Sequence, residues 1–153
     1  MRILVCSDSH GRADRLLRAV ELQPTAEIIV FLGDGEADSD QLLRLPGRTV
    51  YRVCGNGDRG SQLPGWELFT AAGQRVLCTH GHLPRVEWSL DSLWYTARER
   101  GVDIALFGHT HMPFYDYDED CRLHLFNPGA ICDGCCGFVD ITSAGVVCQP
   151  VRM

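Results

Sequence analysis

The stretch DIALFGHTH, residues 103–111, joins a short apolar run to a glycine and two histidines that stand one residue apart. Its apolar half is rich in Ile, Leu and Phe and stops at Gly108, which predicts a buried strand ending in a tight polar turn. Four other apolar runs have the same form, at residues 3–7, 28–34, 49–56 and 75–81. The chain therefore places polar clusters at the ends of five predicted strands.

The segments between these runs show the spacing of amphipathic helices. Helices are predicted within residues 11–24, 37–47 and 87–101. Strands that alternate with helices indicate βαβ units and a largely parallel sheet, so the fold class is α/β. Beyond Thr110 the pattern changes, and two hairpins are predicted to turn at residues 118–120 and 143–145.

Length and composition favour one soluble domain that spans residues 1–153. The net charge is −6 and no basic run is present, which argues against extended nucleic-acid binding or an anionic membrane partner and leaves room for a small phosphorylated substrate. No apolar stretch reaches membrane-spanning length, and the first residues become polar too early for a secretory segment, so a cytoplasmic location is expected. The eight cysteines then stay reduced.

The polar clusters supply a set of oxygen and nitrogen donors without a thiolate. Its members are Asp8, His10, Asp34, Asn56, His80, His109 and His111. Because ligands bind beyond the carboxyl ends of parallel strands, these donors are expected to converge on one edge. If one carboxylate bridges two ions, seven donors make eight bonds, or four to each metal, and Asp34 between two glycines is the natural bridge.

Such a mixture of imidazole and carboxylate suits transition metals better than Ca²⁺ or Mg²⁺. The expected cofactors are two divalent ions, manganese first, with iron, zinc or nickel as alternatives. Each cluster alone is a weak signal, since a single histidine or a Gly-Asp turn is usually structural. Five clusters at five successive strand ends, holding five of the six histidines, are together a strong one.

The order of these motifs resembles the calcineurin-like metallophosphoesterase superfamily. The motifs are Asp-x-His (8–10), Gly-Asp (33–34), Gly-Asn-x-Asp (55–58), His-Gly-His (80–82) and Gly-His-x-His (108–111). Short loops resemble its small bacterial and archaeal phosphodiesterase branch, to which the retromer-subunit relatives of eukaryotes also belong. The likeness runs from Met1 to about Gly129, and FNPGA (126–130) also resembles a family loop.

The resemblance implies a four-layer αββα sandwich of two mixed sheets. It also implies how the donors divide: Asp8, His10 and His111 at the first metal, Asn56, His80 and His109 at the second, and Asp34 between them. The implied reaction is hydrolysis of a phosphate diester by a hydroxide that bridges the metals. Its implied catalytic residues are Asp8, Asp34, Asn56, His80 and His109.

The third motif departs from the family pattern. Many members carry a histidine that helps protonate the leaving group where this chain has Gly57. Asp58 would orient that histidine, so its role is open, and capping or pairing with Arg59 is an equal alternative. His82 and Arg59 are the candidates for substrate binding, each weighed against simple surface exposure.

Three further features invite weaker interpretations. The segment CDGCC brings together Cys132, Cys135 and Cys136, but a single CxxC without a partner pair favours free thiols in a loop over a metal or redox site. The acidic stretch 116–120 is expected to be a solvated hairpin tip. Trp88, Trp94 and Tyr95 fall on one predicted helix and are expected to face the core or a subunit interface.

Two rival functions share this site. One is a non-catalytic scaffold like the retromer relatives, and the other is a phosphomonoesterase. A scaffold under no catalytic demand is expected to lose a ligand, whereas all seven are present here, which favours the enzyme. The expected partner is a small phosphodiester substrate, with assembly into a homo-oligomer left open.

Overall fold

The computed structural model describes all residues 1–153, whose strands form two five-stranded sheets. The first, in the order β10-β9-β1-β2-β3, contains β1 (Arg2–Cys6), β2 (Ile28–Phe31), β3 (Thr49–Arg52), β9 (Cys135–Thr142) and β10 (Gly145–Arg152). The second, in the order β4-β5-β6-β8-β7, contains β4 (Trp66–Ala71), β5 (Gln74–Thr79), β6 (Ile104–Leu106), β7 (Phe114–Asp118) and β8 (Leu123–Asn127). The α-helices are α1 (Ala13–Leu22), α2 (Glu36–Ser39) and α3 (Asp91–Glu99), and two 3₁₀ segments are η1 (Asp40–Arg44) and η2 (Ile131–Asp133).

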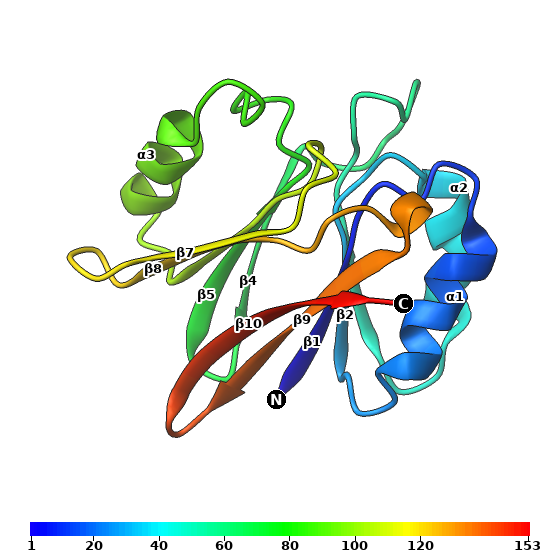
Figure 1. Cartoon of the computed structure of the whole chain (residues 1–153), viewed down its shortest axis with the longest axis horizontal. Coiled ribbons are helices and arrows are strands. Elements are labelled where there is room, and N and C mark those ends of the chain that lie inside the picture. The colour runs from blue at the N-terminus through cyan, green and yellow to red at the C-terminus, as the bar shows by residue number, and fades with distance from the viewer.

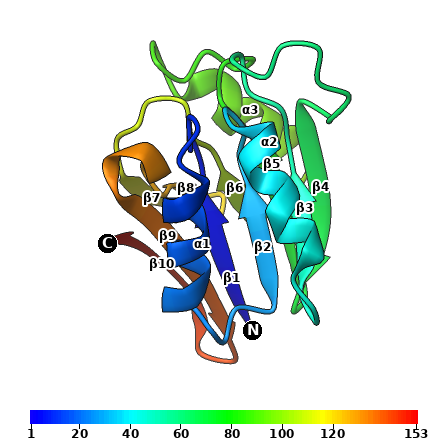
Figure 2. The same cartoon turned by 90° about the vertical axis from the view of Figure 1, so that its right-hand side faces the viewer.

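Both sheets are mixed. In the first sheet β1, β2 and β3 are parallel, β9 runs against β1, and β10 runs against β9. In the second sheet β5, β6 and β8 are parallel, and β4 and β7 run against them. The helices α1 and α2 cover the outer face of the first sheet, and α3 covers that of the second (Figures 1 and 2). The predicted α/β class and the four-layer sandwich are therefore confirmed.

Alternation along the strands explains why these apolar runs build three core layers. In β1, Ile3 and Val5 lie in the cluster between the sheets, while Leu4 and Cys6 pack with residues of α1. The same alternation places Leu77 of β5 and Ala105 of β6 in the layer beneath α3, while their neighbours along each strand lie between the sheets. Each fully buried Leu or Ile stabilises the fold by about 1.5–3 kcal/mol relative to exposure, so a strand buried on both faces must be apolar throughout.

The largest departure from the prediction is β4, which no apolar run had indicated. Its side chains alternate between buried and accessible positions, as Phe69 and Thr70 do, because it is an edge strand with one face toward solvent. It pairs with β5 across a tight turn in which Ala72 and Gly73 both have positive φ. Such a turn matches the twist of the two strands it joins.

The helix expected within 87–101 begins only at Asp91. Trp88 therefore lies outside it and is 79% exposed, and Tyr95 is 65% exposed, so neither faces the core, and the alternative of a subunit interface stays a prediction. Trp94 is half-buried and donates its Nε1–H to the Asp118 carboxylate over 2.7 Å. That contact also corrects the interpretation of 116–120 as a purely solvated tip.

The helix expected within 37–47 is shorter and changes type along its length. A single α-helical turn at α2 continues as the 3₁₀ segment η1, which ends at Arg44 ahead of Pro46. None of the three α-helices has the length and hydrophobicity needed to span a lipid bilayer.

An ion pair joins β1 to β9, and we expect its removal to lower the free energy of unfolding. Arg2 makes a two-pronged contact with Asp140, its register partner, at 2.7 and 2.6 Å, and stacks over Phe138 at 4.1 Å. The hydrogen bond from Arg2 lowers the pKa of Asp140. We expect Asp140→Asn to lower the free energy of unfolding by about 1 kcal/mol, as measured by urea denaturation at neutral pH. The exposed strand residue Asp116, changed to Asn, is the control, and equal losses in both variants would contradict a specific role for the pair.

Candidate metal centre

The five polar clusters meet where the carboxyl ends of parallel strands from both sheets face each other. The loops after β1 and β2 are joined by backbone hydrogen bonds, from Asp8 N to Gly33 O (2.9 Å) and from His10 N to Asp34 O (3.1 Å). Those after β5 and β6 are joined by the bond from Gly108 N to His80 O (2.8 Å). Because each loop is held by its neighbour, side chains far apart in the sequence are fixed against one another.

An unusual backbone conformation accompanies this convergence. Eight non-glycine residues have positive φ, and five of them are predicted ligands: Asp8, His10, Asp34, His109 and His111. Asp and His tolerate this region better than most residues, yet it still costs free energy and persists only where the surrounding structure enforces it. Strain concentrated at these five positions indicates that the loops are shaped to aim their side chains inward.

Asp8, His10 and His111 form one group of donors. The Nε2 atoms of the two histidines are 3.3 Å apart, and Asp8 Oδ1 lies 3.6 Å from that of His10 and 3.2 Å from that of His111. The other oxygen of Asp8 accepts hydrogen bonds from Ser7 Oγ (2.5 Å) and from the backbone N–H of His109 (3.1 Å). One carboxylate oxygen is thereby held in place while the other faces the imidazoles.

Asp34 stands between two groups of histidines. Its Oδ1 accepts the Gly57 N–H over 2.7 Å, and its Oδ2 lies 3.8 Å from His10 Nε2 and 3.6 Å from His80 Nε2. The side chain is buried, and Gly55 leaves the room for it, since a Cβ there would fall 2.0 Å from Asp34 Oδ1. One oxygen of Asp34 is thus held by the backbone while the other faces a histidine of each group.

His80 and His109 form the second group. His80 Nδ1–H donates to the Leu32 carbonyl over 2.7 Å, which leaves the lone pair on Nε2, 3.3 Å from His109 Nδ1. A backbone carbonyl that fixes the tautomer in this way is a common support for a metal-binding histidine. The Nε2 of His109 lies 3.4 Å from Glu87 Oε2, so this ring is supported by a carboxylate where His80 is supported by a backbone carbonyl.

Asn56 is the one predicted ligand whose side chain is not linked to another donor by a hydrogen bond or close ionic contact. It is exposed in the turn after β3, and its side chain makes no hydrogen bond. Its neighbours do contact the site: the Gly57 N–H donates to the Asp34 carboxylate, and the Asp58 carboxylate accepts the Asp34 N–H. Its role as a ligand stays a prediction.

Asp58 has a structural role, with no pairing to Arg59. Its two oxygens accept backbone N–H groups over 2.8–3.0 Å, from Asp34, Gly35, Glu36 and Gly55. Burial raises the pKa of Asp58, but these four hydrogen bonds outweigh that effect and leave the pKa below its ordinary value. The carboxylate thus caps the start of α2 and joins the loops that carry Asp34 and Asn56.

The two predicted substrate contacts differ in their surroundings. The ring of His82 lies beside His80, with centroids 5.4 Å apart, and its buried Nδ1 has no hydrogen-bond partner. Burial lowers the pKa of His82, and the neighbouring His80 and His109 lower it further, so the ring is neutral at neutral pH. Arg59 is exposed and forms no ion pair. Both substrate roles stay predictions.

Sequence reasoning missed several residues that support the site. Asn127, buried at the end of β8, donates to Gly108 O (2.9 Å) and Thr110 Oγ1 (3.1 Å), so the FNPGA segment holds the loop of the two histidines. Asp133 Oδ2 lies 3.3 Å from His111 Nδ1. Only the family likeness of FNPGA hinted at the first contact, and no local pattern indicated the second.

The three cysteines of CDGCC do not act as one group. Cys135 and Cys136 are buried, and Cys136 packs with Cys6 and residues of α1. Cys132 instead faces the site, with its Sγ 4.0 Å from His111 Nδ1. All eight cysteines are free thiols, as expected.

The residues present fit divalent metal ions. Asp8 Oδ1 is buried and has no hydrogen-bond partner, which is costly unless a cation satisfies it. Two groups of potential ligands have their donor atoms within 4.8 Å of one another: Asp8, Asp34 and His80, and separately His10, His111 and Cys132. A cluster of carboxylates and imidazoles around an orphaned oxygen has the chemistry of a metal centre.

Comparison with known proteins identifies the family. Residues 1–143 match the model of the calcineurin-like phosphoesterase superfamily domain, and the chain belongs to this superfamily. The predicted family is thereby confirmed, and with it a metal-dependent phosphoesterase.

Individual relatives agree with this assignment. A Bacillus subtilis protein named "Probable metallophosphoesterase YsnB" is 34% identical over 86% of this chain and 75% of its own. The Escherichia coli K12 protein named "Phosphodiesterase YfcE" is 28% identical over 86% of this chain and 79% of its own. The crystal structure of a conserved Streptococcus pneumoniae protein superposes with a TM-score of 0.85 and 24% identity, covering 99% of this chain and 88% of the other.

Proposed function

We propose that the chain is a dinuclear-metal phosphodiesterase that hydrolyses a small phosphate diester. The observation that carries this proposal is the place of Asp34, whose Oδ2 lies 3.8 Å from His10 Nε2 and 3.6 Å from His80 Nε2. Those histidines belong to two separate donor groups, so one carboxylate between them supports two metal positions. Asp8, His10 and His111 would hold the first ion, and His80, His109 and Asn56 the second.

When bound, two such ions would lower the pKa of an attacking water and neutralise charge on the phosphoryl oxygens. The chain's own residues position this chemistry. Leu32 and the loop contacts of Asp8 orient the ligands, and His82, neutral at neutral pH, stands beside the second group where it can donate to a phosphoryl oxygen. With Gly57 in the third motif, protonation of the leaving group falls to water or to a neighbouring side chain.

The charges around the site support a diester over a monoester. A cavity of about 280 Å³ beside His10 and Asp34 is lined by the acidic Glu36, Asp38 and Asp58 and holds no lysine or arginine. A monoester carries up to two negative charges near neutral pH and a diester one, so the acidic rim penalises the monoester more. The name of the Escherichia coli relative, a phosphodiesterase, points the same way.

The remaining assignments are proposals as well. Manganese is the expected metal, with iron, zinc or nickel as alternatives, because carboxylate and imidazole donors accept all four. A net charge of −6 supports a small-molecule substrate over extended nucleic acid. We also propose that the protein works in the cytoplasm, where its eight thiols stay reduced.

Hydrolysis of two chromogenic esters tests the function directly. The chelator-stripped protein is assayed with bis(p-nitrophenyl) phosphate and with p-nitrophenyl phosphate, before and after addition of Mn²⁺. We expect activity to appear only with metal and to favour the diester. Preference for the monoester would make the protein a phosphomonoesterase, and no turnover of either ester despite bound metal would favour the scaffold.

A further inference from the structure

The backbone places Cys132 beside the first group of donors. Cys132 lies in η2, and its N–H donates to the carbonyl oxygen of Asp8 over 3.1 Å, while the adjacent Ile131 N–H donates to Ser7 O over 2.8 Å. On the other side, Arg15 donates to the carbonyl of Cys132. Two hydrogen bonds therefore hold η2 against the loop that carries Asp8 and His10, and a third joins Cys132 to α1.

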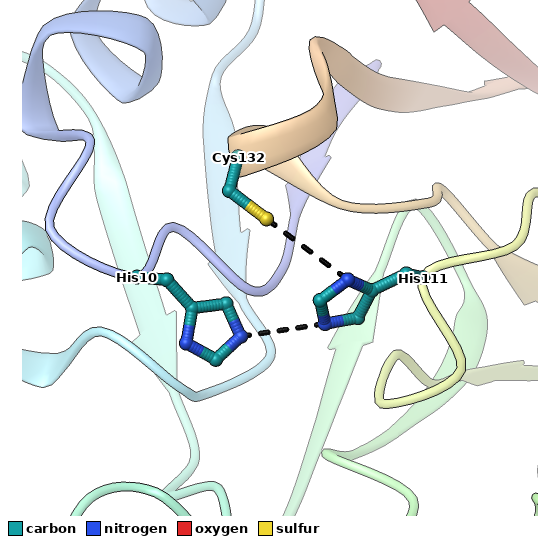
Figure 3. Close-up of side chains that lie close together, drawn as sticks. All are labelled: His10, His111 and Cys132. Carbon is teal, nitrogen blue, oxygen red and sulfur yellow. Dashed lines mark hydrogen bonds between the residues drawn. The ribbon is translucent and has the colours of Figure 1, made fainter.

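The sulfur of Cys132 points toward two imidazoles. Figure 3 shows the sulfur directed at Nδ1 of His111, whose Nε2 faces His10, and the donor atoms of the three residues lie within 4.8 Å of one another. Ligand atoms around a tetrahedral metal with these donors are about 3.3–3.7 Å apart. The two Nε2 atoms, at 3.3 Å, already meet this spacing, and the sulfur of Cys132, 4.0 Å from His111 Nδ1, lies just beyond it.

A second observation comes from the neighbouring carboxylate. Asp8 Oδ1 is buried, without a hydrogen-bond partner, and faces the same two histidines at 3.6 and 3.2 Å. A buried carboxylate oxygen without a hydrogen-bond partner, facing two imidazole nitrogens, favours a cation, because the cation would offset the cost of burying that charge.

We propose that Cys132 is a thiolate ligand of the ion held by His10 and His111, and that it biases this position toward a thiophilic metal such as Zn²⁺ or Co²⁺ over Mn²⁺. On binding, the thiol releases its proton to solvent and a sulfur–metal bond forms, with no change of oxidation state. Soft sulfur ligands favour zinc and cobalt over manganese. The inference rests on the metal centre of the proposed function and not on its substrate.

Cobalt reports sulfur ligation without any assay of activity. The chelator-stripped full chain is titrated with Co²⁺, and we expect a thiolate-to-cobalt charge-transfer band in the near ultraviolet. Cys132→Ser should abolish the band and weaken Zn²⁺ binding by about tenfold or more, with a change of less than about threefold for Mn²⁺. Cys132→His, which retains a ligand, should bind Co²⁺ without the band.

Cys121→Ser is the matched control, because Cys121 is half-buried in the hairpin turn between β7 and β8, outside both donor groups. It should keep the band. A band that survives in Cys132→Ser, or is missing from the unmodified protein with bound Co²⁺, would overturn the inference and leave the sulfur as a mere neighbour of His111. The two proposals fail separately: hydrolysis with Mn²⁺ but no band refutes only the ligand, and a band without hydrolysis of either ester refutes only the enzyme.

Discussion

Replacing Asp34 by Asn is expected to reduce hydrolysis of bis(p-nitrophenyl) phosphate by roughly a thousandfold or more. The change preserves the size of the side chain and one oxygen for the Gly57 N–H. It removes the negative charge that stands between His10 and His80. Two cations close together repel each other, so the loss of a carboxylate between them weakens both positions.

The measurement pairs the rate with metal content. Asp34→Asn and the unmodified protein are loaded with Mn²⁺, dialysed, and compared for bound metal and for turnover of the diester. Asp116→Asn makes the same chemical change on the exposed face of β7, and His124→Ala removes the one histidine outside the five clusters. Both controls should retain metal and activity. If Asp34→Asn behaved like them, the bridging assignment would be wrong.

Replacing Asp58 by Ala is expected to lower the free energy of unfolding by about 3 kcal/mol, although this residue is assigned to neither metal. Four backbone N–H groups lose their acceptor at once, from residues on two different loops. Water can reach some of them because Asp58 is only half-buried, which keeps the loss below the sum of four bonds. Asp58→Asn keeps one acceptor oxygen, so its free energy of unfolding should lie between those of the unmodified protein and Asp58→Ala.

The effect of Asp58 depends on pH in a defined direction. Its pKa is lowered in the folded protein, so its stabilisation is complete above the ordinary aspartate pKa of about 3.9 and is lost as the pH falls through the folded value. The difference in unfolding free energy between the unmodified protein and Asp58→Asn should be constant above about pH 5 and shrink below about pH 4.

Urea denaturation across this pH range is the measurement, and Asp120→Asn in the exposed hairpin turn is its control. If Asp58→Ala lowered the free energy of unfolding no more than Asp120→Asn, the proposal that Asp58 holds the loops after β2 and β3 together would be wrong. Metal binding of Asp58→Ala supplies a second readout. It should weaken even at temperatures where the variant is folded, because Asp34 is held by the loop that Asp58 organises.

The sequence by itself determined the candidate ligands, their order and the strands that carry them. Apolar runs closed by glycine or aspartate define β1, β2, β5 and β6 because burial on both faces requires continuous hydrophobicity, a property of neighbouring residues alone. The spacing Gly108-His-x-His likewise depends on one turn. Local patterns of this kind can be recognised from the sequence alone, and the order of the motifs also indicated the family to which the chain belongs.

Only the tertiary structure decided how these pieces meet. The edge strand β4, half exposed, has no apolar run to reveal it, and the partners of Asp58 lie on two loops separated in sequence. Cys132 lies beside His111 because the backbone N–H of Cys132 in η2 donates a hydrogen bond to the carbonyl oxygen of Asp8, a contact between distant parts of the chain. Such contacts are set by the packing of two sheets against each other, which depends on every strand at once and is not encoded in any local stretch.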